Sequence, residues 1–172
     1  GGMAYTFFRA QGIGTAKSLV EEDKIALAKD LLAKAQGKIR LPTDHVVAAG
    51  FKAEAATKVL PVSEIPEGWM GLDVGPATSK AFAEAVAKAR IVLWNGPMGV
   101  FEMKPFAAGT LAVAQALAES HGTTIVGGGD SVAAITQMGL ADKITHISTG
   151  GGASLEFLAG DPLPGVACLQ ES

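Results

Sequence analysis

The sequence predicts an α/β protein with a parallel sheet and helices on both faces, a Rossmann-like three-layer sandwich. Two observations lead to this fold class. Short apolar segments of strand length alternate with longer segments whose apolar residues recur at helical spacing. Most strand segments are apolar at consecutive positions, which is typical of parallel strands buried on both faces. Residues 45–49 and 57–62 are expected to pair as a small antiparallel excursion.

The expected helices show apolar residues on one face and polar residues or glycines at their ends. Gly1 and Gly2 open the first helix, Gly37 follows the second, and Thr78 is a plausible cap of the third. Gly122 follows the long alanine-rich fourth helix, and Gly139 follows the fifth. In order, the expected helices are residues 3–8, 23–36, 78–89, 106–121, 131–138 and 153–159.

The expected strands are rich in valine, isoleucine, leucine and threonine, and each is bounded by glycine, proline or polar turn residues. A short strand at 39–41 precedes Pro42, and residues 70–76 read as a strand followed by a turn. The remaining expected strands are 45–49, 57–62, 91–94, 123–126 and 144–149. Residues 65–69 read as a loop.

Length and composition indicate one globular domain, with 172 residues, 48% hydrophobic and 18% charged. The formal net charge of −3 argues against general affinity for nucleic acid or acidic membranes. The single cysteine, Cys168, excludes an intrachain disulfide and a cysteine-rich zinc site, which fits a reducing, cytoplasmic compartment. No apolar run approaches the roughly 20 residues that span a bilayer, and no signal-peptide pattern opens the chain.

The most informative stretch is residues 123–131, where four β-prone residues lead into Gly127-Gly128-Gly129-Asp130-Ser131. This pattern predicts a strand, a tight glycine turn and a helix. The exposed N–H groups of the first helical turn and its positive dipole end favour a bound anion, most often phosphate. Asp130 would repel bare phosphate, but a divalent cation can bind carboxylate and phosphate oxygens together. The stretch therefore predicts a phosphate site with a metal ion.

Two further strands end in the same way. The strand at 144–149 leads into Gly150-Gly151-Gly152, and the strand at 92–94 leads into Asn95-Gly96. Ligands of parallel α/β sheets bind outside the carboxyl ends of the strands. We therefore expect the three turns to lie at one edge of the sheet.

Six segments, taken together, resemble phosphoglycerate kinase. Each one alone is weak evidence, but all of them occur in the family's order over nearly the whole chain. They are residues 1–7, 17–21, 71–76, 94–102, 127–131 and 146–156.

The resemblance implies a two-lobed kinase that transfers a phosphoryl group between 1,3-bisphosphoglycerate and MgADP, giving 3-phosphoglycerate and MgATP in glycolysis. Residues 1–172 resemble its nucleotide-binding C-terminal domain, without the first strands and without the N-terminal substrate domain. The chain alone is therefore expected to bind MgADP or MgATP without turnover. Phosphoglycerate would bind only with the N-terminal lobe, and the full enzyme is expected to be a cytoplasmic monomer.

The resemblance also implies roles for single residues. Asp130 is expected to bind Mg²⁺, Glu102 the ribose hydroxyls and Lys17 the α-phosphate. The residues expected to face the transferring phosphoryl group are Thr149, Gly150, Gly151 and Gly152. Those expected to line the adenine slot are Gly1, Gly2, Leu72, Pro97 and Val100. The others expected to contact the nucleotide are Asn95, Gly127, Gly128, Gly129 and Ser131.

Plainer interpretations remain for the same residues. Asp130 is equally suited to cap a helix, and side chains such as Glu102 and Lys17 are usually solvated. An alternative function is a non-catalytic α/β module that binds a nucleotide. A dinucleotide-binding dehydrogenase domain ranks last, because Gly12-Ile13-Gly14 does not continue to the glycine pattern that such domains require.

Overall fold

The computed structural model describes residues 1–148, 152–163 and 168. The chain forms two compact units, which we describe separately. The first comprises residues 1–85 and 97–113, and the second comprises 86–96 and 114–172. Helices α3 (Pro76–Lys88) and α4 (Ala108–Ala118) each contribute residues to both units. The expectation that residues 1–172 form one domain stays a prediction.

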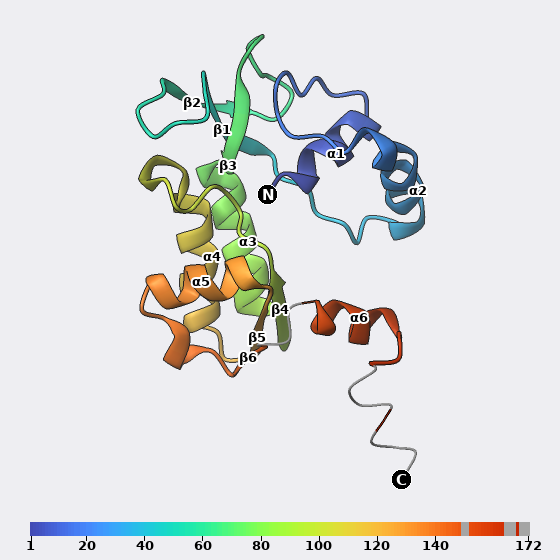
Figure 1. Ribbon diagram of the computed structural model, residues 1–172, viewed down its shortest axis with the longest axis vertical. Coiled ribbons are helices and arrows are strands. Elements are labelled where there is room, and N and C mark those ends of the chain that lie inside the picture. The colour runs from blue at the N-terminus through green and yellow to red at the C-terminus, as the bar shows by residue number, and fades with distance from the viewer. Residues whose placement is uncertain (149–151, 164–167, 169–172) are drawn as a thin grey trace. The chain divides into compact units, whose positions relative to one another are not determined.

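The first unit contains a three-stranded antiparallel sheet of order β2-β1-β3 (Figure 1). Its strands are β1 (Asp44–Ala48), β2 (Thr57–Pro61) and β3 (Met70–Val74). The predicted pairing of the first two strands is confirmed, with Asp44 opposite Pro61 and Ala48 opposite Thr57. β3 also joins this sheet, antiparallel to β1. Its apolar pattern shows that it is buried, but a buried strand has the same pattern whichever direction its neighbour runs.

Two helices of the first unit, α1 (Met3–Ala10) and α2 (Ile25–Ala35), contact each other. The 3-10 helix η1 (Glu22–Lys24) precedes α2, and η2 (Lys104–Phe106) precedes α4. The expected strand at 39–41 is wrong, because these residues form no strand. Pro42 has no N–H to donate to a neighbouring strand and restricts the backbone of Leu41.

The predicted cap of α3 is also wrong. The helix begins at Pro76. It is capped by Asp44 of β1, which lies 34 residues before Thr78 in the sequence. The Asp44 carboxylate accepts hydrogen bonds from the backbone N–H of Ala77 at 2.9 Å and of Thr78 at 2.7 Å. The Thr78 hydroxyl donates to the same carboxylate at 2.6 Å. Burial alone would raise the pKa of Asp44, but these hydrogen bonds outweigh it and lower the pKa.

The second unit contains a parallel sheet of order β4-β5-β6. Its strands are β4 (Ile91–Asn95), β5 (Thr123–Gly127) and β6 (His146–Ile147). Helix α5 (Gly129–Gln137) packs against β5, and η3 (Ala141–Lys143) follows it. The helix predicted at residues 153–159 is confirmed as α6 (Ala153–Ala159). The α/β fold class is thereby confirmed.

The register of the parallel sheet fixes where the glycine turns begin. Asn95, the last residue of β4, pairs with Gly127, the last residue of β5. The turns after these two strands therefore start level with each other at the carboxyl edge. Thr149, predicted to end the third strand, and Gly150 and Gly151, predicted to belong to the turn after it, lie outside the described residues.

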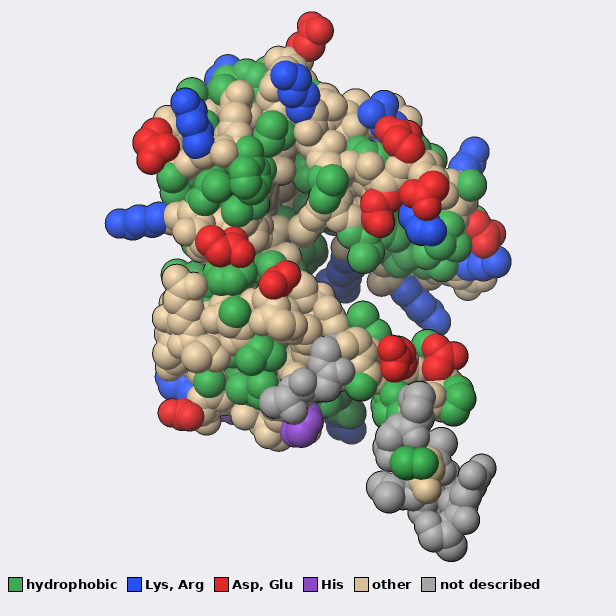
Figure 2. Space-filling model, in the orientation of Figure 1, with side chains coloured by type: hydrophobic (Ala, Val, Ile, Leu, Met, Phe, Trp, Pro, Cys, Tyr) green, Lys and Arg blue, Asp and Glu red, His purple; other side chains and the backbone are tan. Residues whose placement is uncertain are grey.

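Helix α6 exposes apolar side chains. Leu155, Phe157 and Leu158 are 49%, 69% and 63% exposed, and Figure 2 shows hydrophobic side chains at the surface of this helix. None of the helices in the described part of the chain is long and apolar enough to cross a bilayer.

Candidate functional site

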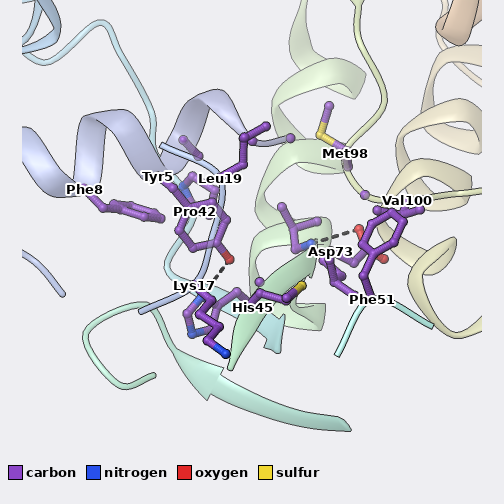
Figure 3. A pocket seen from close by; sticks show the side chains of 18 residues that line it. Tyr5, Phe8, Lys17, Leu19, Pro42, His45, Phe51, Asp73, Met98 and Val100 are labelled. Atoms are coloured by element: carbon purple, nitrogen blue, oxygen red, sulfur yellow. Dashed lines mark hydrogen bonds between the residues drawn. The ribbon is translucent and has the colours of Figure 1, made fainter. Parts of the chain in front are cut away.

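A cavity of about 360 Å³ opens in the first unit, between α1, the turn at residues 15–19, β3 and the loop after β4 (Figure 3). Its walls are mainly apolar side chains and glycine backbone. Tyr5, Lys17 and His45 lie on one side in this view, and Asp73 and Val100 on the other. The remaining lining residues are Gly1, Gly2, Ala4, Phe8, Leu19, Pro42, Phe51, Met70, Gly71, Leu72, Val74, Met98 and Gly99. An apolar slot with close backbone suits a flat heterocycle such as a purine base.

A buried tyrosine–histidine pair forms part of the cavity wall. The Tyr5 hydroxyl lies 3.0 Å from Nδ1 of His45, and His45 Nε2 lies 3.0 Å from the carbonyl oxygen of Glu64. A carbonyl can only accept, so Nε2 carries the ring proton and Nδ1 accepts from Tyr5. Burial lowers the pKa of His45 and raises the pKa of Tyr5, so both side chains are neutral at pH 7. The pair therefore contributes a fixed polar wall rather than a charge.

One glycine in the wall, Gly71, has a neighbour that leaves no room for a side chain. A Cβ on Gly71 would overlap the ring and hydroxyl of Tyr5, which is buried. A Cβ on Gly2 would lie 2.9 Å from Cδ2 of Leu19, but Leu19 is 73% exposed and its side chain can move away. Packing therefore requires glycine at position 71 and not at position 2.

One carboxylate, that of Asp73, lies at the cavity wall with 5% of the residue exposed. Its Oδ1 accepts a hydrogen bond from the N–H of Val74 at 2.8 Å, and its Oδ2 accepts one from Gly109 at 2.9 Å. Burial raises the pKa of Asp73 to about 6, although the two hydrogen bonds favour the charged form. A buried carboxylate with a raised pKa in a cavity is a candidate functional group.

Five residues expected to contact a nucleotide line this cavity: Gly1, Gly2, Lys17, Leu72 and Val100. The N–H of Val100 donates to the carbonyl of Leu72 at 2.9 Å, which fixes the two apolar residues against each other. Pro97 and Glu102 belong to the same unit but are not among the lining residues. The carbonyl oxygen of Pro97 lies 3.1 Å from where a Cβ on Gly1 would be, and Glu102 is exposed.

The other described residues expected to contact the nucleotide gather at the carboxyl edge of β4 and β5 in the second unit. Gly128 has a φ of +85° and forms the N-cap of α5. The Asn95 side chain lies against it, with Oδ1 3.0 Å from where a Cβ on Gly128 would be. Glycine at 128 supplies both the positive φ and the room for Asn95. Strand, turn and helix therefore form as predicted.

Ser131 is fully buried, and its Oγ accepts a hydrogen bond from the N–H of Gly96 at 2.6 Å. This bond ties the turn after β4 to the first turn of α5. The serine hydroxyl thus holds the protein backbone in place, whereas the sequence suggested a direct contact with nucleotide, which stays a prediction.

Asp130 is the second residue of α5 and is exposed. Gly128 occupies the N-cap position, so the interpretation of Asp130 as that cap is wrong. The described residues contain no group of three or more histidine, cysteine, aspartate or glutamate side chains that could hold a metal ion. A cation at Asp130 would therefore need further oxygen ligands from phosphate or water, as Mg²⁺ commonly has. The exposed carboxylate beside free helix N–H groups fits such an arrangement.

Gly152, at the turn before α6, is exposed, and a Cβ there would lie 3.7 Å from Oε1 of Glu156. It has room for a side chain, so packing does not explain why this residue is glycine. Its expected partners Thr149, Gly150 and Gly151 lie outside the described residues.

Sequence reasoning missed several residues of the cavity wall, chiefly Tyr5, His45, Phe51 and Asp73. His45 carried no usable signal, because its partners Tyr5 and Glu64 are 40 and 19 residues away. Phe51 offered none either, because single apolar residues in loops are common at protein surfaces, and the structure leaves this side chain 61% exposed. Asp73 offered one, as a carboxylate within an otherwise apolar strand.

Comparisons with known proteins agree on one family. The sequence model of the family described as "Phosphoglycerate kinase" matches residues 1–161. A cytosolic phosphoglycerate kinase of Triticum aestivum is 61% identical over 178 residues, which cover all of this chain and 44% of the relative. A phosphoglycerate kinase of Herpetosiphon aurantiacus is 59% identical over 99% of this chain and 44% of the relative. The chain thus spans less than half the length of these relatives.

Solved structures give the same result. Phosphoglycerate kinase from Coxiella burnetii superimposes with a TM-score of 0.90 at 42% identity, over 94% of this chain and 43% of that protein. The enzyme from Pyrococcus horikoshii OT3 superimposes with a TM-score of 0.81 at 35% identity, over 97% of this chain and 43% of that protein. Matches of sequence and of fold over nearly all its residues show that this chain belongs to the phosphoglycerate kinase family.

Proposed function

We propose that this chain is the nucleotide-binding part of a phosphoglycerate kinase, which transfers a phosphoryl group between 1,3-bisphosphoglycerate and MgADP in glycolysis. The observation that carries the proposal is the apolar cavity of the first unit. Its walls include Gly1, Gly2, Leu72 and Val100, four of the five residues expected to line an adenine slot. The fifth, Pro97, lies directly beside Gly1.

The polar parts of the nucleotide would bind to charged groups and backbone N–H groups. The Lys17 side chain reaches the cavity and can neutralise a phosphate. The N-terminus of α5, with Gly128 at its cap, offers N–H groups and a positive dipole end to a second anionic group. Glu102 would accept hydrogen bonds from the ribose hydroxyls, and Gly150 to Gly152 would face the transferred phosphoryl group.

Asp130 would hold Mg²⁺ at the phosphates, and the bound ion would neutralise negative charge as the phosphoryl group moves. Asn95 would orient phosphate oxygens, and the packing of its side chain against Gly128 at the start of α5 supports this role. Ser131 would support it by accepting the N–H of Gly96. These residues would position the nucleotide, whose terminal phosphate oxygen attacks the phosphorus of the acyl phosphate as the carboxylate of 3-phosphoglycerate leaves.

The 172-residue chain is proposed to bind nucleotide without turnover by itself. Phosphoryl transfer needs the donor and acceptor aligned and water excluded, for which two closing lobes are suited. The chain spans only 44% of the length of its relatives. The binding site for the acyl phosphate, and the positive charge that balances the transferred phosphoryl group, would therefore come from the remaining part. A non-catalytic nucleotide-binding module is therefore a fair description of the chain in isolation.

We propose a cytoplasmic location, and the wheat and Arabidopsis thaliana relatives, which are named cytosolic, support it. We also propose that the full enzyme is a monomer and binds neither nucleic acid nor membrane. The formal net charge of −3 is consistent with this proposal.

Calorimetry of the chain with MgADP and with adenosine tests the proposal. Lys17→Ala should weaken MgADP binding by several-fold and leave adenosine binding unchanged, because a single exposed phosphate contact contributes about 1 kcal/mol. The matched control is Lys38→Ala, since Lys38 is also exposed but does not line the cavity. Absence of any adenosine or MgADP binding to the unmodified, folded chain would contradict the proposal.

A further inference from the structure

Asp73 has no role in the proposed function, although it lies in the segment 71–76 that resembles the family. It is the one carboxylate among the residues that line the described cavity. The proposed contacts to base, ribose and phosphates come from other residues. The buried carboxylate therefore has a role other than these contacts.

The geometry shows which elements Asp73 joins. Residue 73 belongs to β3, and its Oδ2 accepts the N–H of Gly109, the second residue of α4. The first N–H groups of a helix have no partner within the helix, so Asp73 caps α4 from another element. The positive end of the helix dipole favours a carboxylate there. Asp73 thus links the end of the loop at residues 97–107 to strand β3, which lines the cavity.

The surroundings are built closely around this carboxylate. A Cβ on Gly99 or on Gly109 would overlap Oδ1 of Asp73. The hydroxyl oxygen of Thr110, the next residue of α4, accepts the N–H of Met98 at 3.1 Å and of Gly99 at 3.3 Å. The start of α4 therefore holds the first residues of the loop, and Asp73 holds the start of α4.

The loop held in this way carries two of the residues assigned to the nucleotide. Val100 lines the cavity and donates its N–H to the carbonyl of Leu72, the neighbour of Asp73 in β3. Glu102 follows two residues later. One backbone hydrogen bond and one carboxylate thus fix this loop to two consecutive residues of the strand.

We propose that Asp73 is a positioning residue for nucleotide binding, which anchors α4 through Gly109 and so holds the preceding loop, with Val100 at the cavity wall and Glu102 beside it in the sequence. The inference rests on the proposed function of the cavity. Only a carboxylate suits the position, because it accepts from Val74 and from Gly109 with separate oxygens. An asparagine side chain has one acceptor oxygen, so its NH₂ group would face one of these two donors.

The test compares Asp73→Asn with the matched control Asp44→Asn. Asp44 also accepts two backbone N–H groups at a helix start in the first unit, but it does not line the cavity. Adenosine binding is measured by calorimetry, and the amide signals of Val100 and Glu102 are followed by NMR. We expect Asp73→Asn to bind adenosine about ten-fold more weakly and Asp44→Asn to bind as the unmodified chain does. The Val100 signal should shift with adenosine in both variants, but Asp73→Asn should need about ten-fold more adenosine for the same shift.

The outcomes separate this inference from the proposed function. If the unmodified chain binds no adenosine, the proposed function fails. If it binds and Asp73→Asn binds equally well with the same Val100 shift, the positioning role fails.

A measurement on the unmodified chain keeps the test decisive if Asp73→Asn does not fold. Adenosine should slow hydrogen exchange at the Gly109 amide, which bonds Asp73 but does not line the cavity. Slower exchange at Val100 without any change at Gly109 would overturn the inference.

Discussion

Replacing Asp73 by asparagine should change the stability of the first unit in a pH-dependent way. Burial raises the pKa of this carboxyl from 3.8 to about 6, so its charged form is less favourable in the folded chain than in the unfolded one. A difference of about two pKa units corresponds to about 3 kcal/mol. Asparagine is neutral at every pH and avoids this cost, but its NH₂ group would face a backbone donor that the carboxylate accepts. The change of the stability difference with pH therefore reports on the raised pKa.

The sign of the pH dependence follows from the same shift. Between about pH 6 and pH 4 the folded chain keeps a proton on Asp73 that the unfolded chain releases, so this residue adds stability as the pH falls through that range. The unfolding free energy of Asp73→Asn minus that of its parent should accordingly fall by about 3 kcal/mol between pH 7 and pH 4. His45 acts in the opposite direction, because burial lowers its pKa. Its contribution is common to both proteins and cancels in the difference.

Urea unfolding at a series of pH values measures this difference. Trp69 lies in the first unit and Trp94 in the second, so a Trp94→Phe background makes fluorescence report on the first unit alone. The unfolding free energies of Asp73→Asn and its parent are subtracted at each pH. A difference that stays constant within about 0.5 kcal/mol from pH 7 to pH 4 would refute the raised pKa, since such a residual is typical of surface changes.

Two further predictions concern the other carboxylates. Asp44→Ala should lower the unfolding free energy by about 2 kcal/mol at pH 7, the upper range for losing a helix cap, because three donors lose their acceptor. Since the pKa of Asp44 is lowered, the effect should vanish as the pH falls well below 3.8; a pH-independent loss in urea titrations would contradict the cap. Glu102→Ala should weaken ADP binding by about 1.5–3 kcal/mol but leave adenine binding unchanged, with the exposed Glu84→Ala as control. Equal losses for both ligands in calorimetry would remove Glu102 from the ribose.

The sequence predicted best the elements whose information is local. β4, β5 and α5 were predicted because apolar strand residues run directly into glycines that require unusual backbone, as Gly128 does. Four of the five residues predicted to line an adenine slot line one cavity, and the fifth, Pro97, is not among its lining residues. Here pattern and resemblance indicated the same residues.

The sequence failed where the deciding contact is distant. Asp44 in strand β1 caps helix α3, and no residue near Thr78 in the sequence indicates this contact. The Tyr5–His45 pair joins residues 40 apart, so its place at the cavity requires the folded chain. Ser131 is buried and accepts the N–H of Gly96, which residue type alone does not indicate, and its contact with nucleotide stays a prediction. β3 was expected as a strand, yet its antiparallel partner could not be inferred from its burial pattern.

An NMR titration of the isotope-labelled chain with adenosine and then with MgADP tests the central claim most directly. We expect adenosine to shift the amide signals of Gly71, Leu72 and Val100 at the cavity. MgADP should shift these and, in addition, the signals of Gly128 and Asp130 at the start of α5. Shifts confined to residues outside both groups, such as those of α2 or α6, would contradict the claim that this chain binds a nucleotide in the way proposed.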